Sequence, residues 1–130
     1  MWNEKDVLKK SLQYIKEHLF EQDLNVGNVA ENTNISVKTL SEIFARNGLP
    51  TPCRYIGILR AEQVEKEIIE SIKSGRKEKP AYIAKKCGYT SMVHLTNSLK
   101  CIKNMNFTDF KNAVTNNCLN GNPPLMANKL

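Results

Sequence analysis

The sequence predicts an all-α protein in which two helix-turn-helix, three-helix subdomains are joined by a long linking helix. Three observations lead to this prediction. Apolar residues recur at helical spacing through most of the chain, and no segment alternates as a strand does. A pattern of small residue, turn and cap occurs twice, 54 residues apart. An amphipathic stretch of roughly 21 residues, about 30 Å as a helix, separates the two copies.

The first fifty residues are predicted to form three helices. Residues 5–20 should be an amphipathic helix, whose apolar stripe is Leu8, Leu12, Ile15 and Leu19. A short helix is expected over Val26–Asn32. Ser36 is expected to cap a longer helix that ends near Asn47-Gly48. Residues 1–50 are therefore the predicted N-terminal subdomain.

Residues 51–74 are predicted to be the linking helix. Thr51 followed by Pro52 fits an N-cap with proline at the first helical position. One apolar stripe then continues through Ala61, Val64, Ile68 and Ile72. The helix should persist to about Lys73 and end at Ser74-Gly75.

Residues 75–115 are predicted to be the C-terminal subdomain. After a polar loop, Pro80 should open a short helix through Cys87, and a turn at 88–91 should lead to a helix with the stripe Leu95, Leu99 and Ile102. Asn106 should cap a last short helix. Residues 116–130 are rich in Asn and Pro without periodicity, so a disordered tail is expected.

The two copies of the repeat have the features of a helix-turn-helix. Val29-Ala30 and Asn34-Ile35-Ser36 correspond to Ile83-Ala84 and Gly88-Tyr89-Thr90. In each copy a small alanine permits close helix contact, a residue tolerant of left-handed geometry forms the turn, and Ser or Thr caps the second helix. Because the linking helix is nearly as long as one turn of DNA, both second helices are expected to enter successive major grooves.

The charge distribution agrees with nucleic acid as the partner. The chain has a net charge of +6 and a pI near 9.2, and residues 79–111 carry +5 whereas residues 21–50 carry −2. Charged residues interrupt the apolar positions of the N-terminal segment, which argues against a signal peptide or membrane span and for a cytoplasmic protein.

Cysteine and histidine usage gives no indication of a metal site or cofactor. The cysteines at 53, 87, 101 and 118 form no C-x-x-C pair, and only two histidines are present. Free buried thiols are expected, with Cys118 exposed. His94 is interpreted as a DNA-backbone or surface residue, because no acidic or nucleophilic partner lies near it in the sequence.

Two stretches resemble the DNA-binding region of the AraC/XylS family of transcription regulators. SVKTLSEIFARNGLPTPCRYIGILRAEQVEKEI is similar to the first module of the family, and IAKKCGYTSMVHLTNSLK to the second. The matching positions of the first module are Ser36, Leu40, Phe44, Thr51-Pro52, Tyr55 and Arg60. The resemblance covers about residues 5–115 and implies a stand-alone promoter-binding regulator that acts on RNA polymerase. The chain departs from the family at Glu42 and Asn97, where arginine is usual.

Candidate DNA-contact residues lie on and beside the second helix of each predicted helix-turn-helix. They are Val37, Lys38, Ser41, Glu42, Arg46, Lys85, Lys86, Met92, Val93, Thr96, Asn97, Lys100 and Lys103. The cations at 46, 85, 86, 100 and 103 are candidates for phosphate contact.

The remaining candidates are assigned to base edges, each beside a simpler alternative. Lys38 and Ser41 are expected at base edges, and Glu42 either accepts from cytosine N4 or is a solvated charge that repels phosphate. Met92 and Val93 either touch a thymine methyl group or only pack. Asn97 is expected to pair with adenine. Val37 is expected to face the groove from the first recognition helix, and Thr96 to face outward on the second.

Three classes of function remain after these observations. The leading one is a double-stranded-DNA-binding regulator that binds an asymmetric site as a monomer, since one chain already holds two reading helices. The second is a degenerate AraC-like protein that regulates through protein contact, favoured by Glu42 and by the negative first module. An enzyme is the third and weakest, because no paired carboxylates, Cys-His arrangement or phosphate-binding glycine loop occurs.

Overall fold

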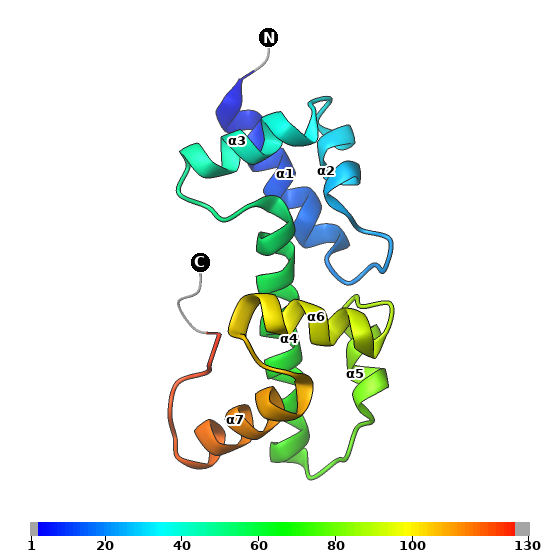
Figure 1. Ribbon diagram of the computed structural model, residues 1–130, viewed down its shortest axis with the longest axis vertical. Coiled ribbons are helices and arrows are strands. Elements are labelled where there is room, and N and C mark those ends of the chain that lie inside the picture. Colours follow the sequence, from blue (N-terminus) through cyan, green and yellow to red (C-terminus); the bar gives the residue numbers. More distant parts are fainter. Residues whose placement is uncertain (1–2, 127–130) are drawn as a thin grey trace.

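The computed structural model describes residues 3–126, which form an all-helical protein (Figure 1). Its helices are α1 (Glu4–His18), α2 (Val26–Asn32), α3 (Val37–Arg46), α4 (Pro52–Ser74), α5 (Pro80–Lys86), α6 (Met92–Lys103) and α7 (Phe107–Leu119). Between residues 3 and 126 no strand occurs. The all-α prediction is confirmed, and the predicted helices are present in the expected order.

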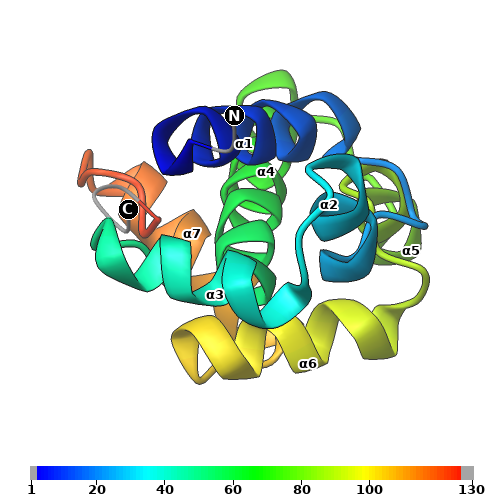
Figure 2. The same cartoon turned by 90° about the horizontal axis from the view of Figure 1, so that it is seen from above.

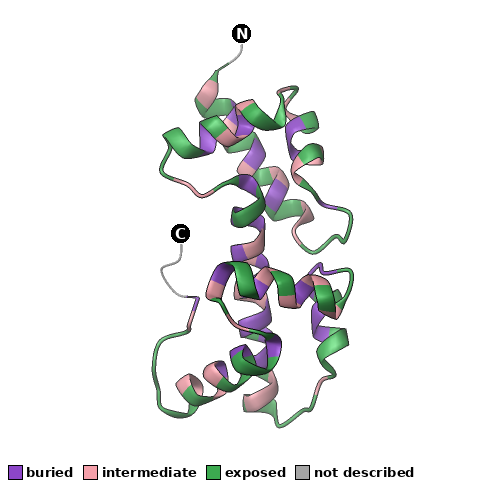
Figure 3. Cartoon of the chain, in the orientation of Figure 1, coloured by how far each residue is buried: buried purple, intermediate pink, exposed green. Residues whose placement is uncertain are grey.

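Helix α4 runs along the long axis of the molecule; α1, α2 and α3 lie at its N-terminal end, α6 crosses its middle, and α5 and α7 lie beside its C-terminal half (Figure 1). It begins at Pro52 with the hydroxyl of Thr51 accepting from the Arg54 N–H at 3.4 Å, and it ends at Gly75, which has a φ of 71°. Its 23 residues are unbroken, which confirms the predicted long helix. Buried positions follow α4 along much of its length (Figure 3).

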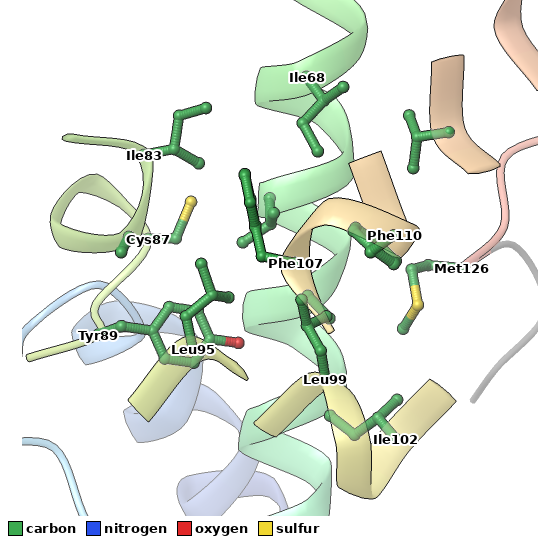
Figure 4. Close-up of a cluster of buried hydrophobic side chains, with 14 of the residues drawn as sticks. Ile68, Ile83, Cys87, Tyr89, Leu95, Leu99, Ile102, Phe107, Phe110 and Met126 are labelled. Carbon is green, nitrogen blue, oxygen red and sulfur yellow. The ribbon is translucent and has the colours of Figure 1, made fainter. Parts of the chain in front are cut away.

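Each end of α4 contributes to a separate hydrophobic cluster. The first cluster unites α1, α2 and α3 around Phe44, whose ring meets the Tyr55 ring of α4 edge-on at a centroid distance of 5.7 Å. The second cluster unites α4 to α7 around Leu95, Leu99 and Phe110 (Figure 4). The sequence therefore places one core at each end of a shared helix.

Arg60 joins the two ends from the middle of α4. Only 4% of its surface is exposed, and it donates from Nε to the carbonyl of Leu19 and from Nη2 to the carbonyl of Glu21, each at 2.9 Å. Its guanidinium also lies 5.8 Å from the ring centroid of Tyr89. The end of α1 and the turn before α6 are thereby held by one side chain.

The predicted disordered tail is wrong for residues 116–126. Helix α7 continues to Leu119, and the chain then returns to α4, where Glu65 accepts hydrogen bonds from the backbone N–H groups of Leu125 and Met126. Met126 is 1% exposed and lies beside Phe110 in the second cluster (Figure 4). Burial of this methionine and the hydrogen bonds to a buried carboxylate compensate for the polar sequence before it. Residues 127–130 of the predicted tail lie outside the described residues.

The expectation of buried thiols holds only for Cys87. That side chain is buried in the second cluster, and the loss of solvation raises its pKa to about 12. Cys53 and Cys101 are exposed, and Cys118, which was expected to be exposed, is half-buried on α7. Cys53 and Cys101 lie on outward positions of α4 and α6, which sequence periodicity alone did not separate from core positions.

Candidate nucleic-acid interface

The turn between α2 and α3 has the same backbone geometry as the turn between α5 and α6. Asn34 has a φ of 59° and Gly88 a φ of 92°, so both occupy the left-handed region. The N–H after each turn returns to the carbonyl of the buried alanine, from Ile35 to Ala30 at 3.1 Å and from Tyr89 to Ala84 at 2.9 Å. Equivalent residues of the repeat thus fix equivalent turns.

Serine caps both helices that follow these turns. The hydroxyl of Ser36 accepts from the Thr39 N–H, and that of Ser91 accepts from the His94 N–H, each at 3.1 Å. The second cap is therefore Ser91 and not Thr90, the residue that the repeat aligns with Ser36. The second turn is one residue longer, and α3 and α6 correspond at an offset of 55 residues rather than 54.

Helices α3 and α6 lie on the same side of α4 and run in the same direction. They are displaced from each other along the long axis in Figure 1, and in Figure 2 both lie along the same edge of the molecule. Their buried residues face the clusters and their opposite faces are largely exposed (Figure 3). Two parallel helices thus present their outer faces on one side.

On these outer faces most of the predicted base-reading residues are accessible. Lys38 and Glu42 are exposed and Ser41 is half-buried, while Val37, at the first position of α3, is 46% exposed. On α6, Val93 is 69% exposed. Asn97 is exposed as well, whereas Thr96 is half-buried.

Met92 differs from the other base-reading candidates. It is half-buried and packs against the second cluster. The packing alternative therefore describes Met92, and Val93 is the apolar residue that α6 presents to its surroundings.

Two of the predicted phosphate contacts are engaged in ion pairs within the protein. Arg46 donates from Nη2 to Glu4 Oε1 at 2.6 Å, and Lys86 donates to Glu67 Oε2 at 3.0 Å. Glu67 is only 5% exposed, and its hydrogen bond is the main cause that raises the pKa of Lys86. Lys86 therefore compensates a buried carboxylate, a role that its sequence position does not indicate.

The remaining cations are free of such pairs. Lys85 and Lys100 are exposed and Lys103 is half-buried. Within residues 3–126 no ion pair involves any of the three. They are thus the predicted phosphate contacts that retain an available charge.

An open groove of about 780 Å³ lies between the start of α2, the first turns of α4 and one face of α6, and no sequence pattern predicts it. The first turn of α4 forms one wall, with Thr51 and Arg54, and α6 forms another, with Asn97 and Cys101. Arg54 is exposed and donates to the Cys101 carbonyl at 3.1 Å. Arg54 therefore lies in the groove wall beside α6 as a further exposed cation. Sequence analysis missed it because an arginine in the first turn of a helix belongs to no periodic pattern.

His94 lies at the edge of this groove and is held by the turn before α6. Its Nδ1 accepts from the Thr90 N–H at 3.2 Å, which leaves Nε2 as the donor of the neutral ring. Burial, and then the charge of Arg60, lower its pKa. The ring is therefore a neutral hydrogen-bond donor near pH 7.

No metal site or membrane helix was found in the part of the chain that the structure describes. Residues 3–126 contain no group of three or more His, Cys, Asp or Glu side chains placed to hold a metal ion. None of their helices has the length and apolar character needed to cross a bilayer.

Comparisons of the chain with known protein families, with curated proteins and with solved structures found no significant match.

Proposed function

We propose that this chain is a sequence-specific, double-stranded-DNA-binding transcription regulator of the AraC type, without a catalytic role. In this proposal residues 1–50 and 75–115 are helix-turn-helix subdomains joined by α4, and α3 and α6 are the reading helices. The observation that supports it most is the parallel placement of α3 and α6 on one side of α4, each after an equivalent turn and serine cap.

Arrangement and charge favour DNA as the ligand. The two reading helices lie on one side of the molecule and are displaced along its long axis, as is required of two helices that enter successive major grooves on one face of a duplex (Figures 1 and 2). The excess of +5 over residues 79–111 supplies attraction to phosphate. Two reading helices in one chain suit a monomer on an asymmetric promoter site in the cytoplasm, with RNA polymerase as the second partner.

A degenerate AraC-like protein that regulates through protein contact is the alternative. Two observations favour it: Glu42 lies exposed on the outer face of α3, where it repels phosphate, and Arg46 on the same helix is paired with Glu4. In this alternative the α3 face binds a partner protein and the DNA affinity of the chain is weak and unspecific.

Selection from a pool of random double-stranded DNA, followed by a gel shift, separates the two proposals. A regulator that reads DNA enriches a defined motif, and Asn97→Ala weakens binding to it by about 5- to 150-fold while leaving unspecific DNA unaffected. Asn112→Ala, an exposed asparagine on α7, is the matched control and should leave binding unchanged. If no motif is enriched and Asn97→Ala has no effect, the protein-contact alternative is favoured.

A further inference from the structure

The two reading helices can be compared position by position, because each begins directly after its serine cap. With Ser36 aligned to Ser91, Leu40 corresponds to Leu95 and Phe44 corresponds to Leu99. All four of these side chains are fully buried. The two helices therefore share their inner faces, and their outer faces can be compared in the same register.

The outer faces differ in chemistry at two corresponding positions. Lys38 on α3 corresponds to Val93 on α6, and Glu42 corresponds to Asn97. All four side chains are exposed, and on each helix the two residues are four positions apart and so share one face. Helix α3 thus presents a cation and a carboxylate where α6 presents an apolar group and an amide.

These two pairs match different base pairs in the major groove. A lysine donates to guanine O6 and N7, and a carboxylate accepts from the amino group at cytosine N4. An asparagine forms two hydrogen bonds with adenine, and an apolar side chain contacts the thymine methyl group. Lys38 and Glu42 therefore suit G·C pairs, whereas Val93 and Asn97 suit A·T pairs.

We propose, building on the DNA-binding function above, that the target is a bipartite site with two chemically different halves. Helix α3 reads a G·C-rich half and α6 an A·T-rich half, with the centres about 10 base pairs apart. Because α3 and α6 run in the same direction, the halves follow one another in a fixed order and are not an inverted repeat (Figure 2). Recognition of the second half depends on thymine methyl groups through Val93.

Selection from random double-stranded DNA followed by a base-analogue cycle tests this proposal. In the enriched duplex each thymine of the A·T-rich half is replaced by deoxyuridine, which removes only the methyl group. Wild-type protein should lose about four-fold in affinity for each methyl that Val93 contacts. Val93→Ala should bind the thymine and deoxyuridine duplexes almost equally, since the contact is already absent.

Controls separate this inference from the proposed function. Leu119→Ala removes an exposed apolar side chain from α7, away from both reading helices, so it should retain the response to deoxyuridine. Exchanging the order of the two halves should reduce binding to the level of random DNA. A defined motif that is insensitive to deoxyuridine, or equally sensitive in Val93→Ala, overturns the bipartite reading while DNA binding stands. Absence of any enriched motif overturns both.

Discussion

Gly88 lies against the guanidinium of Arg60, and a Cβ at residue 88 would come within 2.8 Å of Arg60 Nε. The same Nε is the group that donates to the Leu19 carbonyl, and this carbonyl also lies 2.8 Å from the Cβ position. The turn before α6, the middle of α4 and the end of α1 therefore meet at one point. A glycine is required there both for its φ of 92° and for the absence of a side chain.

Gly88→Ala is accordingly expected to lower the free energy of unfolding by about 2–4 kcal/mol. The cost of a left-handed backbone at an alanine and the cost of overpacking against Arg60 are added together. The matched control is Gly121→Ala, where φ is 69° but no atom lies within 4 Å of a Cβ. The control should cost only about 1–2 kcal/mol. Urea unfolding measures both, and equal losses would show that the contact with Arg60 is unimportant.

Replacement of Arg60 tests how the two ends of the molecule are held together. Arg60→Met keeps the length of the side chain but removes the donor to the Leu19 carbonyl and leaves the Glu21 carbonyl with the Leu24 N–H alone. We expect a loss of about 2–4 kcal/mol in urea unfolding and faster amide exchange at residues 19–22. Arg54→Met, an exposed arginine on the same helix, should cost less than about 1 kcal/mol. Unchanged exchange at 19–22 in Arg60→Met would contradict this role.

The buried carboxylate of Glu65 gives a prediction for the C-terminal segment. Glu65→Ala removes the acceptor for the N–H groups of Leu125 and Met126, so these amides should exchange with solvent much faster and stability should fall by about 2–3 kcal/mol. Glu70→Ala is the control. It removes an exposed carboxylate from α4, five residues after Glu65, and should leave both the amide exchange and the stability unchanged. Slow exchange of Met126 in Glu65→Ala would mean that packing of the methionine alone holds the segment.

Thiol reactivity provides a test that depends on pH. Burial disfavours the thiolate of Cys87 and raises its pKa to about 12, so the folded protein keeps this thiol neutral at pH 8. Brief iodoacetamide treatment followed by mass spectrometry should label the exposed Cys53 and Cys101 and spare Cys87 until urea is added.

The same shift in pKa predicts a fall in stability at alkaline pH. Unfolded Cys87 ionises near its ordinary pKa of 9.0, whereas the folded side chain does not ionise until about 12. The unfolded state therefore releases a proton first, and the free energy of unfolding should decrease as the pH rises above 9. Rapid labelling of Cys87 at pH 8 in the folded protein would contradict both expectations.

The helices and their order follow from the sequence because their signals are local. The stripe of Ala61, Val64 and Ile68 predicts α4, and serine before an apolar run predicts the start of α3. The cap of α6 was misplaced because Thr90 and Ser91 are both capping residues, and only the three-dimensional turn distinguishes them.

Contacts between distant residues explain the other errors. Glu65 binds a segment 60 residues away, and Glu67 and Glu4 pair with the lysine and arginine that were assigned to phosphate. A charged residue in a helix carries no local sign of whether its partner is solvent, a nucleic acid or another side chain. Which residues lie at the site is therefore easier to predict from the sequence than which of their charges remain free to bind phosphate.

The salt dependence of the proposed DNA binding separates the lysines with a free charge from those paired within the protein. Lys100 is exposed on the outer face of α6 without an ion pair in residues 3–126, so Lys100→Ala should reduce the slope of log affinity against log salt concentration by about 0.9 for any DNA sequence. Lys111→Ala, which removes the same charge from α7, should leave the slope unchanged. Lys86→Ala should instead lower stability, because it leaves the buried Glu67 without its partner. Filter binding over a range of potassium chloride concentrations, together with urea unfolding, measures both effects. If Lys111→Ala changes the slope as much as Lys100→Ala does, the positive charge acts as a diffuse field, and α6 has no special part in holding the DNA backbone.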